Sequence, residues 1–196
     1  MSLLFKILNY LIHIPLRIKV KYKLAKFKAY AKMGDNVTLG PMANITKAPT
    51  ASITIGNNCD LLCNLVARSN GCIKIGDYTT IRGYSVIGAV NKILIGNYVI
   101  ISNNVHIYDN NNHPTDPQRR KELSTSGFYS EKWAWEHSES APVVIEDNVW
   151  IGERSTILKG VHIGKGAIVA CDSVVTKDVP ENCIAAGNPA KIVKRF

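Results

Sequence analysis

The sequence predicts an all-β fold, a solenoid of short parallel strands wound into a β-helix. Three observations predict it: a six-residue unit recurs, the fifth residue of the unit is small, and equivalent isoleucines return at a nearly constant spacing. The first residue of each unit is Ile, Leu or Val, and the second is often Gly. Good copies begin at Ile75, Ile81, Ile95, Ile101, Ile145, Ile151, Ile157, Ile163, Val169 and Val175, and weaker ones at Met33, Leu39, Ile55 and Leu61.

Each unit is expected to form a strand of about four residues that ends in a turn, so that three units close a triangular coil of about 18 residues and the coils stack. The aliphatic first residue then points into the prism. The fifth residue also faces inward, near a corner where only small side chains fit. This fifth position is occupied by Ala43, Cys59, Thr79, Ser85, Ser155, Ala167 and Ser173. Cys59 therefore needs no metal or redox role.

The spacing of equivalent residues predicts one long insertion. Ile55, Ile75 and Ile95 are 20 residues apart, a coil plus two residues, but Ile145 follows 50 residues later. Subtracting one coil leaves about 32 residues, which predicts a loop outside the prism at residues 112–142, without secondary structure of its own. A loop of this length inside a regular solenoid is usually functional.

The first 32 residues lie outside the repeat and carry the charge. They hold eight basic residues and no acidic one, whereas the remaining 164 residues hold sixteen basic against fifteen acidic, so the net charge of +9 comes from this segment. Apolar residues first recur at helical spacing, and Pro15 interrupts that pattern. Residues 16–24 then alternate between apolar and basic, as a strand does, so helix and strand both stay open. The helical face consists of Leu4, Ile7, Leu8, Leu11 and Ile12.

Two positions for residues 1–32 are open: packing on the protein's own body or on a neighbouring subunit, or lying on a membrane surface. Residues 3–14 are too short to cross a bilayer, which needs about 20 apolar residues, and they lack a convincing signal cleavage site. Five cysteines without disulfide or zinc spacing favour a reducing, cytoplasmic setting, with the inner face of the membrane as the site of any peripheral contact. A nucleic-acid partner is disfavoured because the basic excess lies beside an aliphatic face.

Several ordered motifs carry a family resemblance. Asn112-His113-Pro114 opens the insertion, and it is followed by Val149-Trp-Ile-Gly, by the units that end in Thr176-Lys-Asp-Val-Pro, and by Gly187-Asn-Pro-Ala-Lys. With these motifs, residues 33–193 resemble the left-handed β-helix hexapeptide acyltransferases, closest to the maltose and galactoside O-acetyltransferases and the cell-envelope polysaccharide O-acetyltransferases. The resemblance implies left-handed coils, acetyl-CoA as the donor, no metal, a homotrimer, and an active site between neighbouring subunits.

Transfer of an acetyl group to a hydroxyl needs a base that removes the proton during attack. His113 matches the family's catalytic histidine, and imidazole suits this role near neutral pH. We therefore expect His113 to be the general base in a direct transfer; the alternative is a histidine that only caps a turn. Asp109 is expected to orient the imidazole or contact the acceptor, or else to be a solvated turn residue. His106 and His162 are expected to be surface residues.

The resemblance also implies a groove for coenzyme A. The positions that line this groove in the sugar acetyltransferases are occupied here by Trp150, Glu153, Cys171, Thr176, Lys177, Lys191 and Lys194. The lysines suit the phosphates of the coenzyme, and the alternative for each is a solvated surface lysine. Glu153 and Cys171 replace the Ser and Ala of the galactoside branch, so their backbone is expected to make the contacts.

The acceptor residues depart from the galactoside branch. Arg82, and Val90 or Asn91, stand where that branch has an Asn and an acidic residue, which argues against a galactoside acceptor. The insertion contains four aromatic residues that suit stacking on sugar rings or, equally, a hydrophobic lid. These are Phe128, Tyr129, Trp133 and Trp135. We expect Arg82, Asn91, Asp109, Trp133 and Trp135 to bind the acceptor.

The expected function is therefore O-acetylation of a saccharide by acetyl-CoA in cell-envelope polysaccharide or lipopolysaccharide synthesis. An N-acetyltransferase for an amino sugar, or a xenobiotic acetyltransferase for a small alcohol, is the alternative. A non-catalytic hexapeptide scaffold is disfavoured, because it would have no reason to retain the His-Pro loop together with the Gly-Asn-Pro-Ala-Lys terminus.

Overall fold

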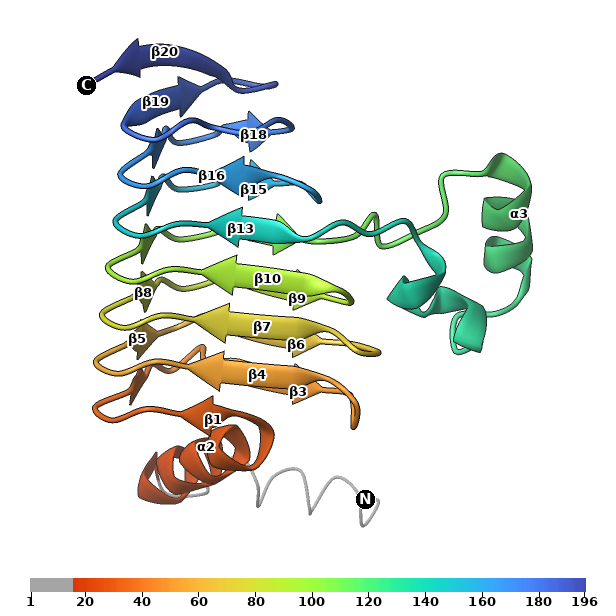
Figure 1. Ribbon diagram of the computed structural model, residues 1–196. Coiled ribbons are helices and arrows are strands. Elements are labelled where there is room, and N and C mark those ends of the chain that lie inside the picture. Colours follow the sequence, from red (N-terminus) through yellow and green to blue (C-terminus); the bar gives the residue numbers. More distant parts are fainter. Residues whose placement is uncertain (1–15) are drawn as a thin grey trace.

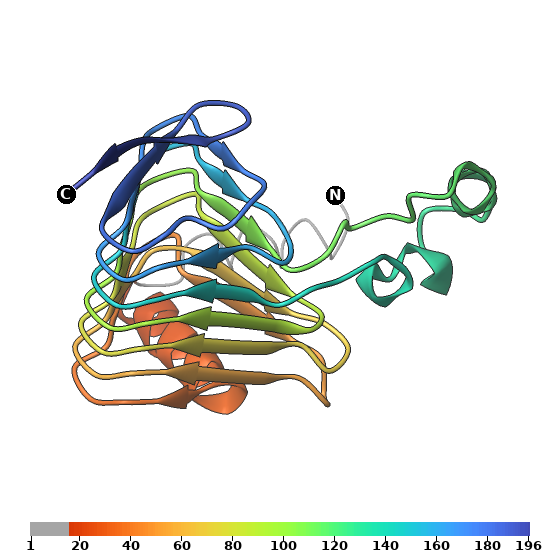
Figure 2. The ribbon, with the colours of Figure 1, turned by 45° about the horizontal axis from the view of Figure 1, so that its top comes forward.

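A computed structural model describes residues 16–196 of the chain; the apolar face predicted between Leu4 and Ile12 lies outside the described residues. The strands form a triangular prism whose three sides are three sheets (Figure 1). From β1 to β18 the chain visits the sheets in turn, so each coil adds one strand to each sheet; β19 and β20 then both join the second sheet and pair antiparallel. Viewed toward the C-terminal end, one corner of the prism carries a projecting segment (Figure 2).

The strands of the three sheets are as follows. The first sheet contains β1 (Lys32–Met33), β4 (Ser52–Ile55), β7 (Cys72–Ile75), β10 (Lys92–Ile95), β13 (Val143–Ile145) and β16 (His162–Ile163). The second contains β2 (Thr38–Leu39), β5 (Asp60–Leu61), β8 (Thr80–Ile81), β11 (Ile100–Ile101), β14 (Trp150–Ile151), β17 (Ile168–Val169), β19 (Cys183–Ala186) and β20 (Lys191–Arg195). The third contains β3 (Asn44–Lys47), β6 (Asn64–Ala67), β9 (Val86–Ala89), β12 (His106–Tyr108), β15 (Thr156–Ile157) and β18 (Val174–Val175).

The core confirms the hexapeptide prediction. Equivalent isoleucines pair in register from coil to coil, as Ile75 does with Ile95 and Ile95 with Ile145, and all ten good copies have a buried first residue. The seven small fifth-position residues are buried as well. The hydroxyls of Thr79, Ser85 and Ser155 each donate to a carbonyl of the next coil, as Thr79 Oγ1 does to Gly96 (2.9 Å), and that of Ser173 donates to Cys171 of its own turn (3.4 Å). Buried hydroxyls need such partners, so small polar side chains fit here as well as alanine.

A ladder of amide and carboxylate side chains ties the coils together at the corner between the first and second sheets. The backbone N–H of Asn57 donates to Asp77 Oδ1 (2.7 Å), that of Asp77 to Asn97 Oδ1 (2.8 Å), and that of Asn97 to Asp147 Oδ1 (2.7 Å). Each rung satisfies a backbone donor that the turn leaves unpaired. The ladder runs unbroken past the insertion, so the coils keep their register on both sides of it.

A helix closes the N-terminal end of the prism. Residues 16–24 belong to helix α2 (Leu16–Tyr30), so helix is the correct one of the two alternatives that the alternating pattern left open. The helix buries Phe27, which is 1% exposed, against the base of the prism. Lys23 Nζ donates to the carbonyls of Gly40 (2.6 Å) and Pro41 (2.7 Å). Lysine, leucine and alanine favour helix, and the uncovered end of the core gives this helix an apolar surface to pack on.

The insertion leaves the prism after β12 and returns at β13. The sequence predicted a loop without secondary structure, but residues 109–142 contain helix α3 (Pro117–Thr125) and the 3₁₀ helices η1 (Glu131–Trp133) and η2 (Trp135–His137). Asp116 caps α3 by accepting from the Arg119 N–H (2.8 Å), and Pro117 stands at its first turn. These are ordinary helix-start signals. Within residues 16–196, none of the helices has the length and hydropathy that a membrane span requires.

Candidate active site

The root of the insertion is fixed by two buried polar residues. The Asp109 carboxylate accepts from the backbone N–H groups of Val90 (2.9 Å) and Asn91 (2.8 Å) and from Asn110 Nδ2 (3.0 Å). Asn110 Oδ1 in turn accepts from the Asn112 N–H (2.8 Å). Asp109 is fully buried, so the expectations that it is solvated, orients an imidazole or touches the acceptor do not fit this structure. Its hydrogen bonds instead anchor the chain just before residue 113.

His113 is exposed at this root. Its backbone N–H donates to the Asn111 carbonyl (2.7 Å), and its ring meets the edge of Trp133 at a centroid distance of 5.5 Å and an interplanar angle of 88°. No other described residue forms a hydrogen bond with the imidazole, so both ring nitrogens are available to a ligand. Beside it, Oδ1 of Asn112 is buried without a hydrogen-bond partner among residues 16–196. Such an acceptor marks a place where a ligand or neighbouring subunit can supply a donor.

The insertion packs back on the prism through Tyr108 and Trp135. The Trp135 ring meets Tyr108 edge-on, with centroids 5.7 Å apart and planes at 87°. Tyr108 lies over Gly88 of the preceding coil, where an added Cβ would stand 2.5 Å from Tyr108 Cε1. Burial raises the pKa of Tyr108. Only glycine leaves room for this arrangement, so Gly88 sets the position of Tyr108 and, through it, of Trp135.

A cavity of about 420 Å³ separates the insertion from the corner turns of the first two coils. It is lined by Ala48, Arg68, Ser69, Trp133, Ala134, Trp135 and Glu136. Trp133 therefore contacts both this cavity and His113, whereas Phe128 and Tyr129 are 72% and 97% exposed and do not line it. Trp133 and Trp135 are the two lining residues that the sequence analysis expected at the acceptor, whereas it did not single out Arg68 and Glu136. The two extra residues in each of these coils, which widen this corner, were the available signal.

The structure divides the predicted donor residues among two corners of the prism and the second sheet. Thr176 and Lys177 are exposed after β18, at the corner that carries the insertion and two coils above its root. Between them and the root, Lys159 Nζ forms an ion pair with Glu139 of the insertion (3.7 Å). Asn91 is also exposed at this corner.

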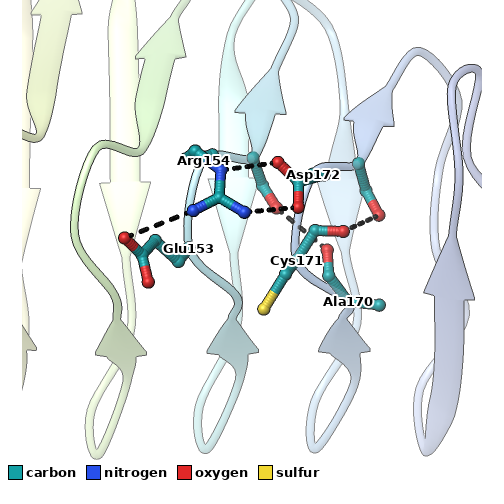
Figure 3. Close-up of polar contacts among 7 residues, drawn as sticks. Glu153, Arg154, Ala170, Cys171 and Asp172 are labelled. Atoms are coloured by element: carbon teal, nitrogen blue, oxygen red, sulfur yellow. Dashed lines mark hydrogen bonds and ion pairs between the residues drawn. The ribbon is translucent and has the colours of Figure 1, made fainter.

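Glu153 and Cys171 lie at the corner between the second and third sheets. Here Arg154 donates from Nε and Nη2 to the two oxygens of Asp172, both at 2.7 Å, and lies 3.6 Å from Glu153 (Figure 3). The hydrogen bond from Arg154 holds the pKa of Asp172 below its usual value, and that of Arg154 is raised by the same bond. Cys171 is exposed beside this pair. A bidentate pair of this kind fixes the two turns relative to each other.

The other donor residues lie on or beside the second sheet. Trp150 is 47% exposed on β14, with Nε1 donating to Ser102 Oγ (3.4 Å), and Lys191 and Lys194 are exposed on β20. Arg82 is exposed after β8, on the same corner as Glu153. The third sheet thus lies between this set and His113. One chain does not bring the two sets together.

Comparison with known proteins identifies the family. Residues 142–177 match the family model described as bacterial transferase hexapeptide (six repeats). Over 150 residues the chain is 33% identical to WbbJ of Escherichia coli, which is named for lipopolysaccharide biosynthesis O-acetyl transfer; the match covers 74% of this chain and 72% of that protein. The chain belongs to the hexapeptide-repeat acyltransferases. The predicted family, enzyme class and left-handed β-helix are therefore confirmed.

Other relatives share shorter stretches with this acyltransferase. It is 41% identical over 124 residues to a Saccharomyces cerevisiae protein named as an acetyltransferase, and spans 56% of that protein's length. It is 52% identical over 60 residues to a Staphylococcus aureus 2,3,4,5-tetrahydropyridine-2,6-dicarboxylate N-acetyltransferase, of which it spans 25%. The solved structure of the hexapeptide-repeat acetyltransferase VCA0836 from Vibrio cholerae superposes with a TM-score of 0.62 at 27% identity, covering 90% of this chain and 80% of that one.

Proposed function

We propose that this acyltransferase moves an acetyl group from acetyl-CoA to a hydroxyl of a saccharide, with His113 as the general base. The observation that carries the proposal is the exposed His113 imidazole, which meets Trp133 edge-on and forms no hydrogen bond with a described residue. It lies beside a tryptophan-lined cavity in a chain similar to WbbJ over most of both lengths. Acetyl-CoA as donor is supported by the Vibrio cholerae relative, whose structure with acetyl-CoA superposes at a TM-score of 0.62.

The chemistry needs one base and a bound thioester. The His113 imidazole takes the proton of the acceptor hydroxyl as its oxygen attacks the acetyl carbonyl carbon. The tetrahedral intermediate then collapses, the carbon–sulfur bond breaks, and coenzyme A leaves as a thiol that carries the proton returned by the imidazolium. The locked backbone at Asp109 and Asn110 supports this role, because a base must be held in place to act within hydrogen-bond distance.

The donor site is proposed to form between subunits of a homotrimer. His113, Thr176 and Lys177 lie at one corner, whereas Trp150, Glu153, Cys171, Lys191 and Lys194 lie across the third sheet from it. A neighbouring copy would supply the second set to the first. The outer face of the second sheet supports such contact, because four apolar side chains stack there in consecutive coils. They are Ile100, Trp150, Ile168 and Ile184.

The acceptor is proposed to enter the cavity that Trp133 lines, next to His113. Trp133 and Trp135 offer ring faces and edges that suit a sugar, and Arg68, Ser69 and Glu136 offer donors and acceptors for its hydroxyls. No described residue pairs with the Arg68 guanidinium, so it is available to a ligand. Asn91 borders the same corner. Arg82 would reach an acceptor only from a neighbouring subunit.

An amine acceptor is the second candidate. The 52% identity over 60 residues to the Staphylococcus aureus N-acetyltransferase favours it. A base at His113 would serve amine and hydroxyl acceptors alike, so the geometry of the imidazole does not separate the two.

Release of free coenzyme A from acetyl-CoA over a panel of mono-, oligo- and lipid-linked saccharides, amines and small alcohols tests the proposal. We expect turnover on saccharide hydroxyls, with the product ester identified by mass and by its lability to mild base. Trp135→Leu should raise the acceptor KM and so lower the rate at acceptor concentrations below that KM. Phe128→Leu, which changes an exposed aromatic residue outside the cavity, is the matched control. Turnover on amines alone would overturn the O-acetyl assignment.

A further inference from the structure

We infer that the outer face of helix α2 is a docking surface for an anionic lipid bilayer. The surface consists of an apolar line, Ile18, Tyr22, Ala25 and Ala29, bordered on one side by Lys21 and Lys28. This inference stands whether or not the acceptor is a saccharide, because it rests on the N-terminal end of the prism and not on the active site.

Helix α2 has two apolar faces. The inner face carries Phe27, which is 1% exposed, and is tied down by the Lys23 hydrogen bonds and by Lys26 Nζ, which donates to Asn44 Oδ1 (2.8 Å). The outer face leaves Ile18 53% and Tyr22 71% exposed. Packing against the core of the prism explains why the inner face is apolar, but it does not explain the apolar side chains on the outer face.

The outer apolar residues fall on one line of the helix. They are spaced four, three and four residues apart, which is the helical repeat. Ala25 and Ala29, the small residues of the line, are exposed like Ile18 and Tyr22. At the boundary between lipid headgroups and acyl chains, Ile18 and Tyr22 would be removed from water, as the apolar side chains of interfacial helices are.

Charge selects the partner. Lys21 and Lys28, both exposed, follow one side of the line. The first acidic residue of the chain is Asp35, so the helix itself carries no negative charge. Long lysine side chains can place their stems along apolar surface and their ammonium groups among phosphates. Anionic headgroups attract such basic segments. A second copy that met this face with its own α2 would instead bring like charges together without an acidic partner, and a nucleic acid would leave Ile18 and Tyr22 unburied.

The geometry also sets the orientation. Helix α2 lies across the end of the prism, and β1, β4, β7 and the later coils stack away from it (Figure 1). A bilayer beneath α2 would therefore meet the prism at its N-terminal end. The cavity between the insertion and the first two coils would then open near the membrane, where a lipid-linked acceptor would be found.

Co-sedimentation of the full chain with vesicles tests the inference. Wild-type protein should bind vesicles of phosphatidylcholine mixed with equal phosphatidylglycerol, bind pure phosphatidylcholine at least about tenfold more weakly, and dissociate in high salt. Two double variants, Ile18→Ser with Tyr22→Ser and Lys21→Glu with Lys28→Glu, should each lower the partition coefficient at least about tenfold. Their thermal unfolding should match that of the wild type, because all four side chains are exposed.

Matched controls separate this surface from general surface charge and aromaticity. Tyr84→Ser and Lys92→Glu change exposed residues on the coils and should bind as the wild type does. Equal binding of the wild type to both vesicle types, or no binding to either, would overturn the inference. The inference would also be overturned if both α2 variants bound vesicles as strongly as the wild type, since another part of the chain would then be responsible for binding. A change in oligomeric state on Ile18→Ser with Tyr22→Ser would place a second copy on this face and would equally overturn it.

Discussion

Replacing Gly88 with alanine should weaken both the fold and acceptor use. The new Cβ would stand 2.5 and 2.6 Å from Cε1 and Cδ1 of Tyr108, and 3.1 Å from Cζ3 of Trp135. Carbon atoms pack best about 3.5–4.0 Å apart, so the Tyr108 ring must move by about 1 Å and Trp135 must follow. Overpacking of this kind costs about 1–3 kcal/mol. For a chain of this size, that lowers Tm by about 2–12 °C.

The assay combines thermal unfolding with initial rates for the best acceptor of the panel. The acceptor KM should rise, because Trp135 lines the cavity, whereas the acetyl-CoA KM should not change. Gly83→Ala is the matched control. Its Cβ would meet only Met42 Sδ at 3.1 Å and Asn103 Oδ1 at 3.8 Å, and a flexible thioether can give way.

Removing the Tyr108 ring identifies the cause. In a Tyr108→Ala background, Gly88→Ala should cost less than about 0.5 kcal/mol, because the two closest atoms are gone and only Trp135 Cζ3, at 3.1 Å, remains near the new Cβ. The difference between the costs in the two backgrounds is the coupling energy of residues 88 and 108. Equal costs in both backgrounds, or equal Tm values for Gly88→Ala and Gly83→Ala, would refute the reasoning.

Three further predictions follow from burial and charge. Phe27→Ala should lower the free energy of unfolding by about 3–5 kcal/mol in denaturant titration, and a loss below 1 kcal/mol would show that α2 does not cap the core. Because Arg154 lowers the pKa of folded Asp172 below 3.8, the pair stabilises the protein above that pH and the effect is lost as the pH falls through the folded pKa. The Tm difference between wild type and Asp172→Asn should therefore be present at pH 7 and vanish in acid once the folded Asp172 carboxyl is protonated, below the usual pKa of an aspartate; a difference that persists in strong acid would contradict it. Iodoacetamide should label exposed Cys171 but not Cys63, whose pKa burial raises to about 12, and acetyl-CoA should slow the labelling of Cys171; labelling at the same rate with donor would remove Cys171 from the groove.

The repeating part of the fold could be predicted because one physical rule fixes many positions. Each inward residue, from Ile75 to Val175, obeys the same period, and a single corner geometry demands small residues such as Ser85. A copy that departs from the pattern can still be placed, because the copies before and after it fix its register. The coil arithmetic likewise predicted the insertion, because the spacing from Ile95 to Ile145 depends only on strand register.

The parts that occur once were predicted less well. Alternation in residues 16–24 could not choose helix, because the buried partner of Phe27 exists only after the coils have stacked. Asp109 was expected to orient the imidazole or contact the acceptor, but its carboxylate accepts from the backbone N–H groups of Val90 and Asn91. These donors belong to the preceding coil, so they come near Asp109 only in the folded chain. Arg68 was not singled out for the same reason: the cavity that it lines forms only when the folded insertion packs opposite its corner turn.

The central claim is that His113 is the base of acetyl transfer, and its removal tests that claim most directly. Coenzyme A release should be measured at saturating donor and acceptor for wild type and His113→Ala, with His162→Ala, a surface histidine on the first sheet, as the control. A lost general base predicts a fall in turnover of about 10²–10⁴-fold for His113→Ala with unchanged unfolding, and near wild-type turnover for His162→Ala. If His113→Ala kept more than about a tenth of wild-type turnover, far above what loss of a general base allows, the account would be wrong.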